Sequence, residues 1–209
     1  MRKQIVLGVA AILALVLAGC GGGDSRPVFV AQILSDQPSD GDIAFDGVTF
    51  TPTQGPVTLF FGIDDNDPDF PEYRAFLDFP LDGSTGQDVV PANAVIVSAT
   101  LEIFIDRVNF ADPVPALLDL VEYVPGSLVA ADFTSVPLAF RSLDFFATGT
   151  GNFVAIDVTP LMREAQRRGL PDFQVRFLLD FALSNFGFVG IEDRPNIALT
   201  APLLTVEYR

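Results

Sequence analysis

Hydrophobic and polar residues alternate along much of the chain with the period of two that is typical of β-strands. In the clearest runs every second residue is apolar. These runs are 73–79, 99–105, 173–181 and 203–208. Weaker alternation marks 43–50, 57–62, 117–124, 138–146, 153–158 and 186–192. Glycines and prolines fall mostly between these runs, so the pattern predicts many short strands and an all-β sandwich or barrel.

One segment departs from this period and predicts a short helix over about 159–169. Thr159 is a candidate cap, Pro160 suits the first helical position, and Gly169 follows the last periodic residue. The apolar positions, which include Ala165, form a narrow stripe on one side. We therefore expect this helix to lie across one end or edge of the sandwich.

The first 19 residues predict a lipoprotein signal peptide. Arg2 and Lys3 precede an uncharged apolar run over 5–17, which has the length of a signal-peptide core and is short for a membrane span. The motif LAGC at 17–20 then resembles the lipobox of bacterial lipoproteins. That resemblance implies cleavage before Cys20 and lipidation of its thiol, which would anchor the chain in a membrane. The alternative is an ordinary secretory signal or N-terminal anchor with an incidental cysteine.

The residue after the cysteine bears on location. Gly21 stands where an aspartate tends to retain lipoproteins in the inner membrane, so the lipobox resemblance implies the outer membrane in a Gram-negative cell. Residues 20–39 are rich in Gly, Asp, Ser and Pro, and they predict a flexible tether after the lipidated cysteine. We expect the β-sandwich domain over 40–209. Cys20 is the only cysteine, so the core alone must hold this domain together.

Several stretches, in their order and spacing over roughly 40–208, resemble the DNRLRE domain, a group that overlaps carbohydrate-binding module family ninety-six. They are YRAFLDFPL (73–81), VIVSATLEIFI (95–105), FVAIDVTPLMREAQRRG (153–169), FQVRFLL (173–179) and RPNIALTAPLLTVEY (194–208). The resemblance implies an antiparallel β-sandwich of jelly-roll type on a secreted or surface protein. It also implies polysaccharide binding, which is known for some members.

Composition narrows the functional classes. The chain has 27 acidic and 12 basic residues and a net charge of −15, which opposes non-specific binding to nucleic acid. It contains no histidine, and Lys3 is its only lysine, so triads with a histidine base and the usual zinc sites are excluded. A carboxylate pair of the glycosidase kind is what remains for an enzyme. We therefore expect a non-catalytic protein.

Four residues are candidates for ligand binding. The Tyr73 ring offers a face on which a sugar can stack. We expect Arg74, Arg107 and Arg176 to point away from the apolar sides of their strands, where they would form a shallow basic stripe that binds acidic groups. The alternative is that Tyr73 is a core residue with its hydroxyl at the rim, and that each arginine pairs with a nearby acid.

The acidic stretch 64–69 is a candidate calcium site. Asp65, Asp67 and Asp69 alternate, so an extended backbone would send all three carboxylates to one side, and Asp64 would add a fourth. Calcium prefers six to eight oxygen ligands of this kind. The alternative is a solvated turn, because Asp, Asn and Pro are the residues that turns use.

Together these observations predict a membrane-anchored lipoprotein of the cell envelope that binds a glycan and catalyses no reaction. The alternative is a structural or assembly lipoprotein whose sandwich binds an envelope protein and no glycan.

Overall fold

The structure is a computed structural model that describes residues 27–183, 186–195 and 199–209. Cys20 and the predicted signal peptide lie outside these residues. The strands are β1 (Phe29–Leu34), β2 (Gly41–Phe45), β3 (Phe50–Gln54), β4 (Thr58–Ile63), β5 (Glu72–Pro80), β6 (Ile96–Asn109), β7 (Val114–Val121), β8 (Ala139–Phe145), β9 (Asn152–Asp157), β10 (Asp172–Leu179), β11 (Phe188–Glu192) and β12 (Leu203–Tyr208). The helical elements are α2 (Ala130–Phe133), the 3-10 turn η1 (Ala147–Gly149) and α3 (Thr159–Arg168).

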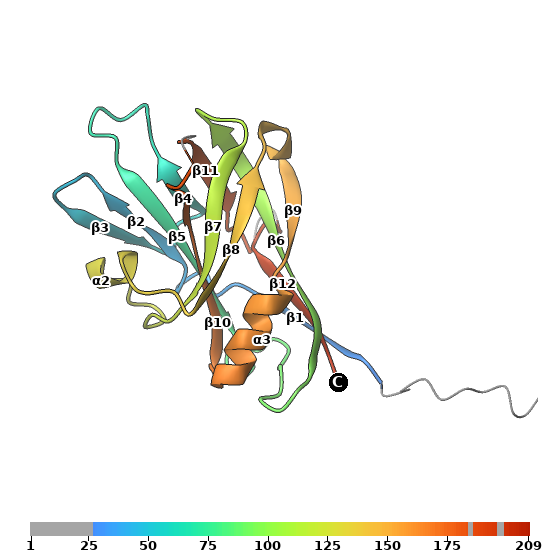
Figure 1. The fold of residues 1–209 in the computed structure, drawn as a ribbon. Helices are drawn as coiled ribbons and strands as arrows, with labels where there is room; N and C mark the ends of the chain where they lie inside the picture. The colour runs from blue at the N-terminus through green and yellow to red at the C-terminus, as the bar shows by residue number, and fades with distance from the viewer. Residues whose placement is uncertain (1–26, 184–185, 196–198) are drawn as a thin grey trace, which may run out of the picture.

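Strand pairing is antiparallel throughout the described residues, and it joins the strands into one sheet. The main path runs β1-β12-β6-β11-β4-β5-β10-β7-β8, while β9 pairs with β6 and the β2–β3 hairpin pairs with β5. The sheet curls around a common interior, with α3 at one end (Figure 1). The predicted all-β antiparallel sandwich with a short helix is therefore confirmed, in the form of a single curled sheet.

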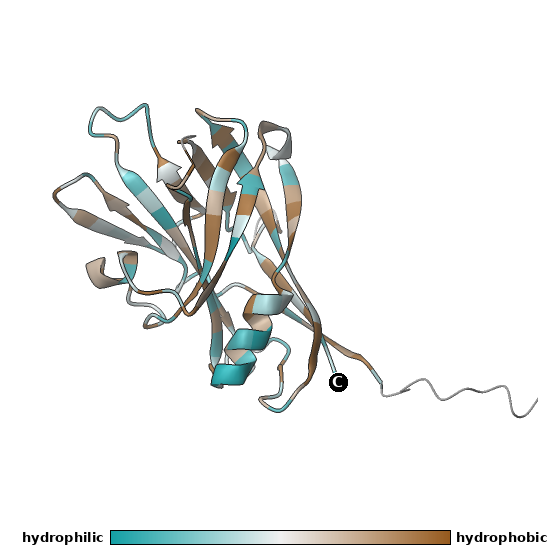
Figure 2. Ribbon diagram, viewed as in Figure 1, coloured by the Kyte–Doolittle hydropathy of each residue, from teal (hydrophilic) through white to brown (hydrophobic). Residues whose placement is uncertain are grey.

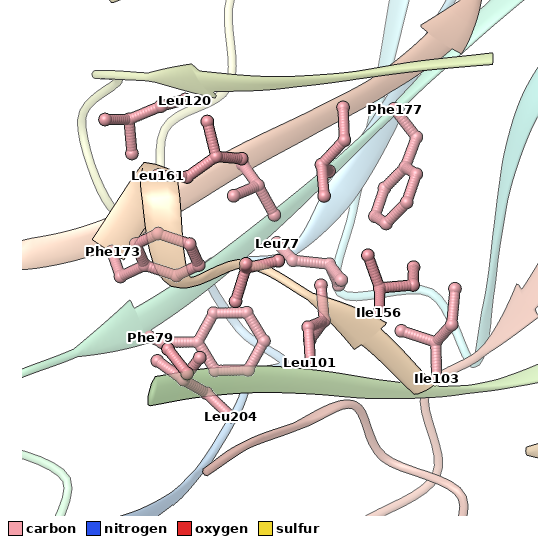
Figure 3. Close-up of a cluster of buried hydrophobic side chains, with 14 of the residues drawn as sticks. Leu77, Phe79, Leu101, Ile103, Leu120, Ile156, Leu161, Phe173, Phe177 and Leu204 are labelled. Atoms are coloured by element: carbon pink, nitrogen blue, oxygen red, sulfur yellow. The ribbon is translucent and has the colours of Figure 1, made fainter. Parts of the chain in front are cut away.

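The main core lies inside this curl, where alternate side chains from facing strands meet. In β10 the residues Phe173, Val175, Phe177 and Leu179 are all buried. Figure 3 shows two of them, Phe173 and Phe177, packed with leucines and isoleucines that come from other strands and from α3. The alternation of period two therefore identifies the inward face of this strand correctly.

The predicted helix over 159–169 is confirmed as α3. Gly169 ends it in the left-handed conformation, with φ of 70°, which a residue without a Cβ adopts without strain. The helix begins one residue earlier than a Thr159 cap would require, because Val158 is the capping residue and Thr159 is already helical. The Thr159 hydroxyl instead accepts a hydrogen bond from the Ala99 amide at 2.9 Å. The apolar stripe is buried, while the solvent side of α3 is hydrophilic (Figure 2).

The predicted tether over 20–39 is wrong from residue 29 onward. β1 pairs along its whole length with β12, from Phe29 opposite Tyr208 to Leu34 opposite Leu203. The polar turn that follows also packs, because Asp40 is fully buried and accepts a hydrogen bond from the Asp78 amide at 2.7 Å. Turn residues indicate a bend in the chain, but they do not show whether that bend lies on the domain or apart from it. The domain therefore begins with β1 and not at residue 40.

The region predicted as one strand over 43–50 forms two. β2 and β3 are joined by a turn in which the Asp46 carboxylate accepts hydrogen bonds from the amides of Val48 and Thr49. This hairpin and the short helix α2, which the sequence pattern did not predict, pack on a second hydrophobic cluster outside the main core. Its buried members are Ile43, Phe76, Val121, Tyr123, Leu128 and Phe133.

No helix in the part of the chain that the structure describes is both long enough and apolar enough to cross a membrane.

Candidate functional site

The structure divides the four predicted ligand-binding residues between two places. Arg74 and Arg176 bind the end of α2, on the side of the sheet that the second hydrophobic cluster covers. Tyr73 and Arg107 lie next to a group of aromatic rings that β4 and β11 contribute. The predicted stripe of three arginines is therefore not formed.

Arg176 is a structural residue. Its guanidinium pairs with the Asp119 carboxylate at 2.6 Å, and both side chains are almost completely buried. It also donates to the backbone carbonyl of Phe133 at 3.0 Å, and Arg74 donates to the same carbonyl at 2.6 Å. The guanidinium of Arg74 lies 4.0 Å from the centre of the Phe133 ring. Both arginines thus satisfy the carbonyl end of α2, where helices favour positive charge, and they are not placed to meet a ligand.

Tyr73 and Arg107 belong to one cluster of side chains. The ring centres of Phe60 and Phe188 are 5.0 Å apart, and that of Tyr73 lies 6.1 Å from Phe60 and 5.4 Å from Phe188. The Arg107 guanidinium lies 5.3 Å from the centre of the Phe60 ring, within the range of a cation–π contact. We call these four side chains the platform.

The pairing of three strands explains why Arg107 meets Phe60. Gly190 of β11 pairs with Arg107 on one side and with Phe60 on the other. Because Gly190 has no side chain, its two neighbours close over it, and an added Cβ would lie 3.2 Å from each of them. The register between β11 and β6 also shifts after Gly190, in a bulge that leaves Asp106 without a paired residue. The Asp106 carboxylate accepts a hydrogen bond from Arg107 at 2.7 Å.

The platform is partly open to solvent. The Arg107 side chain is 46% exposed, Phe60 and Tyr73 are half-buried, and Phe188 is buried. Burial, together with the nearby carboxylates of Asp42, Asp64 and Asp67, raises the pKa of Tyr73, so its hydroxyl stays protonated. Exposed ring surface beside a guanidinium and a carboxylate can stack on a sugar and hydrogen-bond its hydroxyls.

Burial also raises the pKa of the Asp42 carboxyl to about 6. That carboxyl accepts a hydrogen bond from the Phe60 amide at 3.0 Å, so it helps to fix β4 beneath the platform.

The acidic stretch 64–69 forms a turn. The Asp64 carboxylate accepts a hydrogen bond from the Asn66 amide at 3.0 Å, and the Asp67 carboxylate accepts one from the Asp69 amide at 3.0 Å. These are the local bonds by which aspartates stabilise turns. Over 27–183, 186–195 and 199–209, no group of three His, Cys, Asp or Glu side chains is placed to bind a metal ion. The structure therefore does not assemble the predicted calcium site from Asp64, Asp65, Asp67 and Asp69.

Three other carboxyl groups, Asp40, Asp78 and Asp193, are completely buried. Burial and the charge of Asp193 raise the pKa of Asp40 well above its ordinary value. Burial also raises the pKa of Asp78 to about 7, with a contribution from Asp172, and that of Asp193 to about 6. Such shifts often mark catalytic acids. Here the buried side chains are out of reach of a polysaccharide, so their effect is on folding.

Sequence reasoning missed two members of the platform, Phe60 and Phe188, because both lie in runs of weak alternation. The sequence signal that could have located the platform is Gly190, which lies inside a run of strand-forming residues. A glycine inside a strand suggests a close approach by neighbouring groups.

No protein-family model matches the chain, and no curated protein matches it. The resemblance to the DNRLRE domain therefore rests on the sequence stretches quoted above.

Proposed function

We propose that this chain is a non-catalytic lipoprotein of the cell envelope, anchored through Cys20, whose sandwich binds a glycan at the platform. The observation that carries the proposal is the closure of Phe60 and Arg107 over the missing side chain of Gly190, with the Tyr73 ring against Phe60. The C–H face of a pyranose packs on aromatic rings. The exposed groups of Arg107 and Asp106 supply a hydrogen-bond donor and an acceptor at its edge.

The charges favour a neutral glycan over a strongly acidic one. Arg107 is already paired with Asp106 at 2.7 Å, so the platform has no uncompensated positive charge. The net charge of −15 adds a long-range repulsion toward polyanions. A neutral polysaccharide is therefore the ligand class that this site fits best.

The position of the platform also suits a protein that is anchored at its N-terminus. Phe29, at the start of β1, pairs with Tyr208, which in turn pairs with Ile96 at the start of β6. Arg107 lies near the other end of β6, eleven residues further along, which corresponds to about 35 Å of extended strand. A lipid anchor before β1 would thus hold the platform away from the membrane surface.

Glycan arrays with the full chain in a non-ionic detergent test the binding site. We expect binding to neutral polysaccharides that Phe60→Leu and Arg107→Gln each weaken by about tenfold, the loss of roughly 1.4 kcal/mol. Arg141→Gln is the matched control, because Arg141 is a partly exposed arginine on β8, outside the platform. Binding that survives both platform variants would place the site elsewhere. If no glycan on the array binds, and crosslinking captures an envelope protein, the alternative of a structural or assembly lipoprotein is favoured.

The anchor is tested separately in cells that are labelled with palmitate. The wild-type chain is expected to incorporate label and to fractionate with the membrane, because two or three acyl chains hold a protein there stably. Cys20→Ser should remove the label and leave an uncleaved or soluble chain. Continued incorporation by this variant contradicts lipidation at Cys20.

A further inference from the structure

We propose a second binding site, in a hollow at the loop end of the sandwich, that takes a quaternary ammonium cation such as choline. The inference goes beyond glycan binding and does not rest on it. The hollow has a volume of about 360 Å³ and is lined by Ile63, Asp65, Phe70, Phe110 and Phe186. That volume is in the range of small-molecule sites.

Three phenylalanines and one aspartate are among the five residues that line this hollow. Phe70, Phe110 and Phe186 are 54%, 44% and 49% exposed, so their ring surfaces face open space and are not packed in the core. None of the five described residues that line the hollow is basic. Aromatic rings attract cations through their negative faces, and cages of several rings are the usual way in which proteins bind quaternary ammonium groups.

Two of the three phenylalanines hold a backbone conformation that bulky residues rarely adopt. The φ angle is 47° at Phe70 and 69° at Phe110, both in the left-handed region that favours glycine. Burial of the two side chains does not offset this backbone strain, since each ring is about half exposed. Strain of this kind concentrates at ligand-binding sites, where it presents a side chain in a required direction.

The third ring is held by close backbone contacts next to it. Gly187 accepts a hydrogen bond from the Ile63 amide at 2.9 Å, which fastens the start of β11 to the end of β4. A Cβ on Gly187 would collide with the Val114 side chain and would lie 3.0 Å from the Asn109 carbonyl oxygen. The neighbouring residue, Phe186, is thereby kept close to Ile63 at the hollow.

Electrostatics select the type of cation. Asp65 is among the residues that line the hollow, whereas the other aspartates of the same loop lie outside that lining. Inorganic cations and primary ammonium groups keep tightly bound water, which apolar rings cannot replace. An alkylated ammonium is weakly hydrated, so it gains from the rings and the carboxylate together.

Calorimetric titration of the full chain in a non-ionic detergent, with tetramethylammonium chloride and then choline chloride, tests the site directly. We expect saturable binding of both. Sodium chloride is expected to produce none at the same ionic strength, and the neutral isostere 3,3-dimethyl-1-butanol is expected to bind less tightly than choline. Glycerophosphocholine distinguishes the source of the group. If glycerophosphocholine binds as choline does, the site accepts the headgroup of a lipid. If glycerophosphocholine does not bind, the site takes only the free cation.

Variants assign the binding to the hollow. Phe70→Leu, Phe110→Leu and Asp65→Asn should each weaken choline binding by about 3- to 10-fold, the range expected for one cation–π or charge contact. Phe140→Leu is the control for an exposed ring elsewhere, since Phe140 is 64% exposed on β8. Asp69→Asn controls for charge, because Asp69 is on the same loop and outside the lining.

Both control variants should change the dissociation constant by less than about twofold, because exposed charges outside the site are screened by solvent and salt. Equal binding of choline and its neutral isostere, or no binding of either ammonium ion, overturns the proposal. An equal loss in Asp65→Asn and Asp69→Asn would show only general electrostatic attraction and would also overturn it. Glycan binding at the platform is expected to be unchanged in every one of these variants, so the two proposals fail independently.

Discussion

Arg107 and Arg176 were both expected to point away from the apolar side of their strands. Arg176 lies between the apolar positions of its strand, whereas Arg107 comes two residues after Ile105 and faces outward because the bulge at Asp106 shifts the register. In the folded chain the Arg107 side chain is 46% exposed, whereas the Arg176 side chain is only 3% exposed. Arg107 contacts the Phe60 ring and Asp106 at an open surface. Arg176 pairs with Asp119 under α2.

What separates the two arginines is the layer outside the sheet. The outer side of β5 and β10 is covered by α2 and the β2–β3 hairpin, which bring their own apolar residues and bury the polar side chains beneath them. The Arg107 side chain has no comparable cover. The same residue type therefore lies at an open surface in one region and in an internal ion pair in the other.

The largest expected effect comes from breaking the ion pair on the covered side. Arg176→Met removes a cation of similar length and leaves the Asp119 carboxylate buried without a partner, so we expect the free energy of unfolding to fall by about 3–5 kcal/mol. Urea denaturation monitored by circular dichroism measures this change. The double variant Arg176→Met/Asp119→Leu should recover much of the loss, because it removes both charges. A single variant as stable as the wild type would show that α2 does not bury this pair.

The second effect is a dependence of stability on pH that arises from buried carboxyl groups. The pKa values of Asp78 and Asp193 are raised by burial to about 7 and about 6, above the ordinary value of 3.8. The folded chain therefore holds these protons more tightly than the unfolded chain, so stability falls as pH rises from about 4 to 7. Each pKa unit corresponds to about 1.4 kcal/mol. We expect a loss of roughly 2–4 kcal/mol between pH 5 and pH 7.5.

Urea midpoints across this pH range test the prediction. Asp78→Asn should flatten the dependence and raise the stability at pH 7.5, since an amide has no proton to lose. Asp69→Asn, which changes an exposed carboxylate, should keep the wild-type dependence. A midpoint that rises steadily from pH 5 to pH 7.5 contradicts the assignment.

The smallest expected effect is on the open side. Arg107→Ala removes an exposed side chain and a surface ion pair, so the free energy of unfolding should change by less than about 0.5 kcal/mol. The same denaturation experiment measures it beside Arg176→Met. If the two variants were equally destabilised, the contrast between an open and a covered face would be lost.

Local patterns that extend over several residues could be predicted from the sequence. The strand predicted over 173–181, which forms as Asp172–Leu179, and the helix that ends before Gly169 were both predicted, because side-chain alternation and backbone preferences are properties of neighbouring residues. The lipobox at Cys20 is likewise a local motif. It lies outside the described residues and stays a prediction.

The tertiary structure decided which polar residues meet water and which distant residues meet each other. The burial of Arg176 depends on α2, about 45 positions earlier in the chain, and the burial of Asp40 depends on β5. The platform likewise joins Phe60, Tyr73 and Arg107 from three strands through a glycine in a fourth. The sequence by itself determined the all-β class, the inward faces of the clearest strands and the helix. Strand order, register and the covering layer decided the rest, because alternation shows which two faces a strand has but not what lies against either of them.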